Sequence, residues 1–198
     1  HACHDAAQWR RAGRQLRLAV NASGLQLVSP GIADIIDAAL AASGYPADQL
    51  TIEITETAAM RDPEAAIRVL TSLRDRGILL SLDDFGTGYS PLTALRDLPV
   101  EVIKLDRTFV AGLGSHAGEN LAAGILHLGV STNMLVVAEG IETRSQAERL
   151  GELGCHFGQG YLWSPAVPER DVLATIAHIE SEGSAESALK YSMSVSCE

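Results

Sequence analysis

Short apolar segments alternate with segments of helical periodicity along this chain of 198 residues. We interpret six of the apolar segments as strands, at about residues 16–20, 50–55, 78–82, 100–105, 134–138 and 158–162. Strands joined by helical crossovers form parallel sheets. An open doubly wound sheet is one such architecture, but the glycine-rich dinucleotide fingerprint is absent from the sequence. The alternation therefore predicts an α/β fold built on a parallel sheet.

Polar or charged residues close every predicted strand, and this favours a barrel. They are Asn21, Glu53, Asp83 with Asp84, Lys104 with Asp106, Glu139 and Gln159. Catalytic groups that converge from many strand ends are typical of (β/α)₈ barrels. About six βα units are present, so we expect an incomplete TIM-like barrel whose first two strands lie before His1. We expect this partial domain over residues 1–180, followed by a serine-rich tail over 181–198 that is disordered or an appended helix.

The composition limits the partners. Hydrophobic residues make up 46% of the chain and charged residues 20%, which is typical of a globular protein. The formal net charge of -10 argues against DNA and anionic membranes as general partners. No apolar run is long enough for a membrane span. Three cysteines without ligand spacing indicate reduced thiols and a cytoplasmic setting.

Two adjacent carboxylates, Asp83 and Asp84, stand between an apolar run and a loop that contains Gly86 and Gly88. Carboxylate and amide oxygens are the ligands that Mg²⁺ and Mn²⁺ prefer. Two neighbouring aspartates can serve two ions, which activate water and neutralise a phosphoester. In the competing interpretation, these strand-end groups are helix caps and rim ion pairs. A Schiff-base role for Lys104 is a further alternative, although the aspartate pair has no use in it.

Five ordered motifs resemble one family: IEITET, LSLDDFGTGYS, VIKLDRTFV, VVAEGIET and GQGYL. They are similar to the EAL domain family of cyclic di-GMP phosphodiesterases, and LAVNAS matches the family's VNxS segment. The resemblance covers residues 2–173. It implies a modified (β/α)₈ barrel with one antiparallel strand, and hydrolysis of one phosphodiester of cyclic di-GMP to give pGpG.

The resemblance implies a ligand set for two ions of Mg²⁺ or Mn²⁺. Asn21, Glu53 and Asp83 hold the first ion in this scheme, with Asp83 bridging to the second. Asp84 holds the second ion, and Asp106 supports it.

The resemblance also implies roles around the substrate. Lys104 contacts the attacking water or the substrate phosphate, and Glu139 is the general base or orients that water. Gln159 completes the substrate side, and Glu142 supports the rim. Glu56 anchors the glycine loop over residues 86–90, which is expected to be a lid or a dimer contact.

The chain departs from the family pattern at one place. The Glu-Ala-Leu segment lies upstream of VNxS in the family and is not in this sequence, so one metal-ligand glutamate is missing. The alternative to an enzyme is therefore a catalytically inactive module that binds cyclic di-GMP. The resemblance further implies a homodimer and an upstream sensor or GGDEF-type domain in the parent protein.

Overall fold

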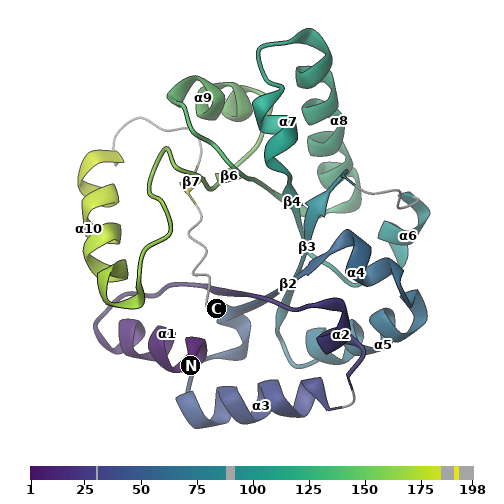
Figure 1. Ribbon diagram of the computed structural model, residues 1–198, viewed down its shortest axis with the longest axis vertical. Helices are drawn as coiled ribbons and strands as arrows, with labels where there is room; N and C mark the ends of the chain where they lie inside the picture. The colour runs from purple at the N-terminus through teal and green to yellow at the C-terminus, as the bar shows by residue number, and fades with distance from the viewer. Residues whose placement is uncertain (30, 88–91, 184–189, 192–198) are drawn as a thin grey trace. The chain divides into compact units, whose positions relative to one another are not determined.

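The computed structural model describes residues 1–29, 31–87, 92–183 and 190–191, and Figure 1 shows the ribbon. The chain divides into two compact units. The first comprises residues 1–83, 88–101 and 194–198, and the second comprises 84–87 and 102–193. Each unit has its own strands and covering helices, so the two are described separately.

The first unit is built on β1 (Leu18–Asn21), β2 (Leu50–Thr55) and β3 (Leu79–Phe85), whose last two residues belong to the second unit. Its helices are α1 (Ala2–Arg11), α2 (Gly24–Leu27), α3 (Ile32–Ser43), α4 (Glu56–Met60), α5 (Pro63–Arg74) and α6 (Leu92–Asp97), with a 3₁₀ turn at Ala47–Gln49. Figure 1 shows α1 beside α3, and these two helices are in contact.

The strands of the first unit are parallel and in a register that sorts their side chains by face. Leu18 pairs with Leu50 and Ile52 pairs with Leu80. Because side chains alternate between the two faces of a strand, Ile52, Ile54, Leu80 and Leu82 share one face, and none of them is more than 4% exposed. The opposite face, called the polar face below, carries Thr51, Glu53, Ser81 and Asp83 together with Leu79.

Local signals set the helix ends in this unit. The Asp62 side chain accepts a hydrogen bond from the Ala65 N–H, and Pro63 occupies the first turn of α5. The α3 helix ends at Gly44, whose φ of 69° is the left-handed conformation of a glycine cap. These caps explain why the helix boundaries follow the sequence prediction closely.

The second unit contains β4 (Val102–Leu105), β5 (Leu135–Ala138), β6 (Phe157–Gly158) and β7 (Lys190–Tyr191). The neighbouring pairs β4–β5, β5–β6 and β6–β7 are parallel. Its helices are α7 (Arg107–Ala111), α8 (His116–Thr132), α9 (Arg144–Glu152) and α10 (Val172–Gly183), with a 3₁₀ turn at Glu169–Asp171. Leu105, Val110, Leu126, Ala138 and Leu150 are among its buried core residues.

Several elements differ from the sequence prediction. The strand predicted at 158–162 is β6, which ends at Gly158, because the chain turns there and the Trp163 N–H bonds back to the Gly160 carbonyl. The short helices α2, α4 and α7 and the strand β7 were not predicted. Residues 88–91 and 184–189, with parts of the predicted lid and tail, lie outside the described residues. Among the described helices, none has both the length and the apolar character that crossing a bilayer requires.

Candidate active site

The polar face of the first unit brings together the three residues that the sequence assigns to a first metal ion. Asn21 pairs in register with Glu53 at the ends of β1 and β2. Glu53 pairs in turn with Ser81, and Asp83 follows two residues later on β3. Since residues paired in a parallel ladder, and residues two apart on a strand, share a face, Asn21, Glu53, Ser81 and Asp83 all lie on one face. Glu53 is only 5% exposed, so its carboxylate is largely removed from water.

Glu56 lies just beyond this face, at the start of α4. The preceding residue, Thr55, caps the helix with its side-chain oxygen, which accepts from the Ala58 N–H. A carboxylate in the first turn of a helix interacts favourably with the helix dipole. Glu56 is 4% exposed, so it is buried. Glu56 is predicted to anchor the glycine loop over residues 86–90, and residues 88–90 of that loop lie outside the described part of the chain. The contact stays a prediction.

Asp84 adopts a backbone conformation that is unusual for a residue other than glycine. Its φ is 54°, in the left-handed region, where aspartate and asparagine are tolerated better than most residues. In a regular strand, two adjacent side chains point to opposite faces. The left-handed turn at Asp84 interrupts that alternation directly after Asp83. Conformations of this kind concentrate at functional sites, where the surrounding structure maintains them.

In the second unit, Lys104, Glu139 and Gln159 form a connected polar network at the ends of β4, β5 and β6. The Lys104 ammonium lies 2.7 Å from Glu139 Oε1, and Gln159 Nε2 donates to the same oxygen at 2.6 Å. The side chains of Lys104 and Glu139 are only 6% and 15% exposed. A buried charge is tolerated where a partner of opposite charge and hydrogen bonds accompany it. The pair therefore keeps two ionised groups inside the second unit.

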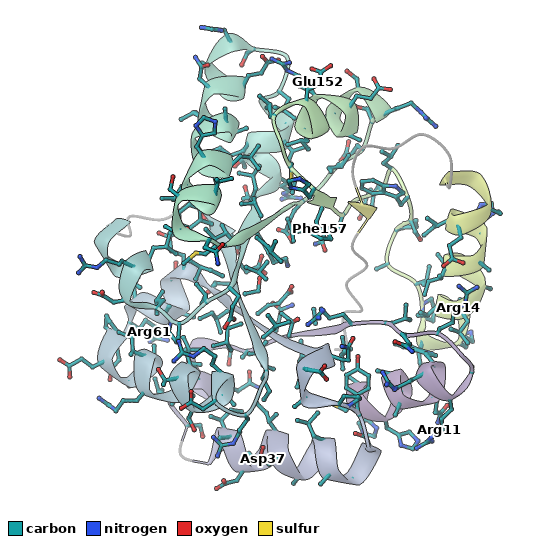
Figure 2. The ribbon with its side chains drawn as sticks, turned by 180° about the vertical axis from the view of Figure 1, so that it is seen from behind. Arg11, Arg14, Asp37, Arg61, Glu152 and Phe157 are labelled. Carbon is teal, nitrogen blue, oxygen red and sulfur yellow. The ribbon has the colours of Figure 1, made fainter. Side chains whose placement is uncertain are left out.

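Backbone hydrogen bonds place these three side chains side by side. The Glu139 N–H donates to the Leu105 carbonyl, and the Gln159 N–H donates to the Ala138 carbonyl. The ladder thus continues one residue beyond the strands on each side. Phe157, labelled in Figure 2, begins β6 two residues before Gln159. The carboxyl ends of three parallel strands supply the network, as the barrel interpretation predicts.

The carboxylates of Asp84 and Glu139 fit a divalent cation. Each offers an oxygen, and these two oxygens lie within 4.8 Å of one another. Ligands on opposite sides of Mg²⁺ or Ca²⁺ are about 4.0–5.2 Å apart, since each lies about 2.0–2.6 Å from the ion. Hard carboxylate oxygens are the donors that such ions prefer. The residues present therefore suit a hard divalent cation better than zinc.

Two other predicted site residues have contacts that suit a structural role. Asp106 Oδ1 accepts hydrogen bonds from the N–H and the hydroxyl of Thr108, and so caps α7. This agrees with the competing interpretation of strand-end acids as helix caps, and the support that Asp106 gives to a metal stays a prediction. Glu142 is exposed, and its backbone N–H donates to the Gln146 side chain at the start of α9.

The sequence interpretation passed over Ser81. It lies within the apolar segment that predicts a strand at residues 78–82, and it is the residue in register with Glu53. Its position two residues before Asp83 was the signal that could have identified it, because side chains two apart on a strand share a face. Ser81 thus belongs to the polar face of the first unit.

Cys155 packs in the hydrophobic core of the second unit. Its thiol donates to the Phe157 carbonyl at 3.2 Å, and burial raises its pKa above the ordinary value. A buried thiol with a raised pKa is a poor nucleophile and a poor metal ligand. Cys155 is therefore a packing residue.

Known proteins resemble this chain over most of its length. A family model described as an EAL domain matches residues 1–166. The chain is 38% identical over 179 residues to the bifunctional diguanylate cyclase/cyclic di-GMP phosphodiesterase MucR of Pseudomonas aeruginosa, covering 89% of this chain and 26% of that protein. It therefore spans about a quarter of the length of MucR.

Solved structures agree with the sequence match. A MucR phosphodiesterase structure in complex with c-di-GMP aligns with a TM-score of 0.82 and 37% identity, over 86% of this chain and 70% of that one. A manganese and c-di-GMP complex of Klebsiella pneumoniae BlrP1 aligns with a TM-score of 0.76 and 32% identity, over 83% of this chain and 42% of that one.

Proposed function

Because the chain belongs to the EAL domain family, whose fold is a modified TIM-like barrel, we propose that it hydrolyses cyclic di-GMP to the linear dinucleotide pGpG. The name of MucR includes this phosphodiesterase activity, and the MucR structure holds c-di-GMP. The net charge of -10 is compatible with such an anionic substrate, since divalent cations can bridge protein carboxylates to phosphate. The proposal therefore requires a metal site among the acidic strand ends.

The observation that carries the proposal is the carboxylate pair Asp84 and Glu139, with oxygens within 4.8 Å, next to the buried Lys104 ammonium. Two carboxylates this close repel each other by about 3.5 kcal/mol at an effective dielectric constant of about 20. A cation between them would remove this repulsion. Lys104 offsets part of it from the side of Glu139. A phosphodiester oxygen is a ligand that such a cation accepts readily.

In the proposed reaction, a water oxygen attacks phosphorus and the bond from phosphorus to one ribose oxygen breaks. That ribose oxygen takes up a proton from solvent and becomes a free hydroxyl group of pGpG. A pair of divalent cations, when bound, lowers the pKa of that water and neutralises charge on the phosphate. Lys104 places a positive charge beside the reacting phosphate or the water. Glu139 accepts a proton from the attacking water or orients it, and Gln159 holds the Glu139 carboxylate through its amide. One phosphomonoester is left in pGpG.

The polar face of the first unit supplies the remaining ligands in this proposal. Asn21, Glu53 and Asp83 hold one ion, and Asp83 is shared with the ion that Asp84 holds. The manganese and c-di-GMP complex of BlrP1 supports Mn²⁺ as an ion for this site, with Mg²⁺ as the alternative. We further expect, from the family, a homodimer, a cytoplasmic location and an upstream sensor or GGDEF-type domain in the parent protein.

The test is a product assay on the purified chain with cyclic di-GMP, separated by liquid chromatography. We expect pGpG in Mn²⁺ and none after chelation with EDTA. Asp84→Asn should abolish product, while Asp75→Asn, which changes an exposed aspartate, should leave the rate unchanged. Binding of cyclic di-GMP without product would instead favour the inactive binding module, and absence of both would reject the proposal.

A further inference from the structure

Ser81 has a buried hydroxyl group that the fold leaves unsatisfied. The residue is 1% exposed, and its Oγ has no hydrogen-bond partner among the described residues. Burying a hydroxyl group without a partner is unfavourable, and most buried side-chain oxygens in proteins are bonded. Alanine would occupy nearly the same volume without this cost. The hydroxyl group therefore needs an explanation beyond packing.

The position of Ser81 on β3 points to a role at the metal ligands. Ser81 is paired in register with Glu53, and Glu53 is paired with Asn21. Asp83 follows Ser81 by two residues on the same face. On the polar face, Ser81 is therefore next to Glu53 on the neighbouring strand and two residues before Asp83 on its own strand. All four residues belong to the first unit.

We propose that Ser81 is a positioning residue for the first metal ion: its hydroxyl group donates a hydrogen bond to the Glu53 carboxylate when Glu53 coordinates the ion. This inference rests on the metal site of the proposed function. A carboxylate that binds a metal through one oxygen still accepts hydrogen bonds, and partners of this kind orient the ligand. The Ser81 hydroxyl group then has a hydrogen-bond partner in the metal-loaded protein. In the metal-free protein it has none among the described residues, and this lowers the stability of that state.

The test compares Ser81→Ala with Ser43→Ala, a matched substitution at a second serine that is buried among the described residues of the first unit. Ser43 Oγ donates to the Ala39 carbonyl and accepts from the Tyr45 N–H, so its loss should lower the melting temperature. Ser81→Ala removes an unsatisfied group and should leave the melting temperature in EDTA equal to that of the parent or higher.

Metal affinity is the second measurement, by calorimetric titration of the chain with Mn²⁺. Loss of a hydrogen-bond partner of a ligand typically weakens binding by about 10-fold to 100-fold. We expect Ser81→Ala to raise the Mn²⁺ Kd by about 10-fold. Ser43→Ala should leave the Kd unchanged, because its contacts lie at the end of α3.

The outcomes separate the two proposals. A weaker Mn²⁺ affinity without loss of metal-free stability supports the role of Ser81. An unchanged Kd in Ser81→Ala overturns that role while leaving the metal site in place. If the melting temperature of Ser81→Ala falls as far as that of Ser43→Ala, the Ser81 side chain stabilises the metal-free fold. That result also overturns the proposed role of Ser81 as a positioning residue. Absence of Mn²⁺ binding to the parent chain overturns the metal site and, with it, the inference about Ser81.

Discussion

Removing the charge of Lys104 should destabilise the protein strongly. Its ammonium lies 2.7 Å from Glu139 Oε1, and both side chains are largely buried. The Coulomb attraction at this distance is about 6 kcal/mol at an effective dielectric constant of about 20. Desolvation offsets much of it, and deletion of one partner of a buried pair typically costs about 3–5 kcal/mol. We expect Lys104→Met to lower the free energy of unfolding by that amount.

The arrangement around Glu139 makes the cost specific to charge. In Lys104→Met, Gln159 remains bonded to Glu139, but the repulsion from Asp84 is no longer offset by the ammonium. Adding Glu139→Gln should therefore recover about 2–3 kcal/mol, within the range of coupling energies for residues in contact. Urea denaturation followed by circular dichroism in EDTA measures each variant.

Arg76→Met is the matched comparison. Arg76 and Asp37 form an ion pair at 2.9 Å, but their side chains are 32% and 49% exposed. Ion pairs between exposed side chains contribute little to stability, because solvent screens them. If Lys104→Met costs no more than Arg76→Met, or if Glu139→Gln fails to recover stability, the buried ion pair does not have the energetic role assigned to it.

Three more predictions follow from particular residues. Gly86→Ala should lower both the free energy of unfolding and the Mn²⁺ affinity. The φ of Gly86 is +91°, and an added Cβ would lie 2.7 Å from the Phe109 ring. Urea denaturation measures the first effect and calorimetric titration the second. Asp83→Ala should abolish Mn²⁺ binding in the same titration, because a bridging ligand cannot be replaced without losing the ion spacing. The raised pKa of Cys155 should make unfolding stability fall as pH rises above about 8.5, the ordinary thiol value, and Cys155→Ala should flatten that decline in urea denaturation.

Each of these has its own check. Gly13→Ala isolates the backbone term for Gly86→Ala, since Gly13 has a similar φ of +88° but no neighbouring atom within 4 Å of an added Cβ. Equal costs in the two glycine variants would exclude the contact with Phe109. Mn²⁺ binding retained in Asp83→Ala would exclude the bridging role. Cys155 is an acid whose pKa is raised in the folded state, so its contribution to the free energy of unfolding is complete at low pH and is lost as the pH rises. A decline unchanged in Cys155→Ala would assign it to other groups.

The sequence predicts the order of elements well because the signals for it are local. Glycine stops such as Gly44, the Asp62-Pro63 start and the apolar periodicity of α5 act over a few residues. The TIM-like barrel class, predicted from polar strand ends, is confirmed by the likeness to EAL domain structures. The short helix α7 was missed because Asp106 was assigned to chemistry and not considered as a cap.

The contacts within the site could not be predicted from local signals. Glu139 and Gln159 are 20 residues apart, and their hydrogen bond depends on the pairing of β5 with β6. The face to which Ser81 belongs depends likewise on its register with Glu53. The prediction that the segment around Ser81 is a buried strand is confirmed, since Leu80, Ser81 and Leu82 are all buried. The pattern did not show that Ser81 shares one of the two buried faces with Glu53. The strand register therefore determines which side chains meet in the site, and the sequence pattern does not reveal that register.

Phosphorus NMR of cyclic di-GMP incubated with the chain and Mn²⁺ tests the proposed activity most directly, with each spectrum recorded after a chelating resin has removed the paramagnetic ion. Hydrolysis of one bond converts one of two equivalent phosphodiesters into a phosphomonoester. The account predicts a monoester resonance and a linear diester resonance that have equal area and grow together. In the same incubation with the Asp84→Asn variant, the spectrum of cyclic di-GMP should stay unchanged. A spectrum that retains only the diester of cyclic di-GMP, with the nucleotide bound to a Mn²⁺-loaded chain, would contradict it.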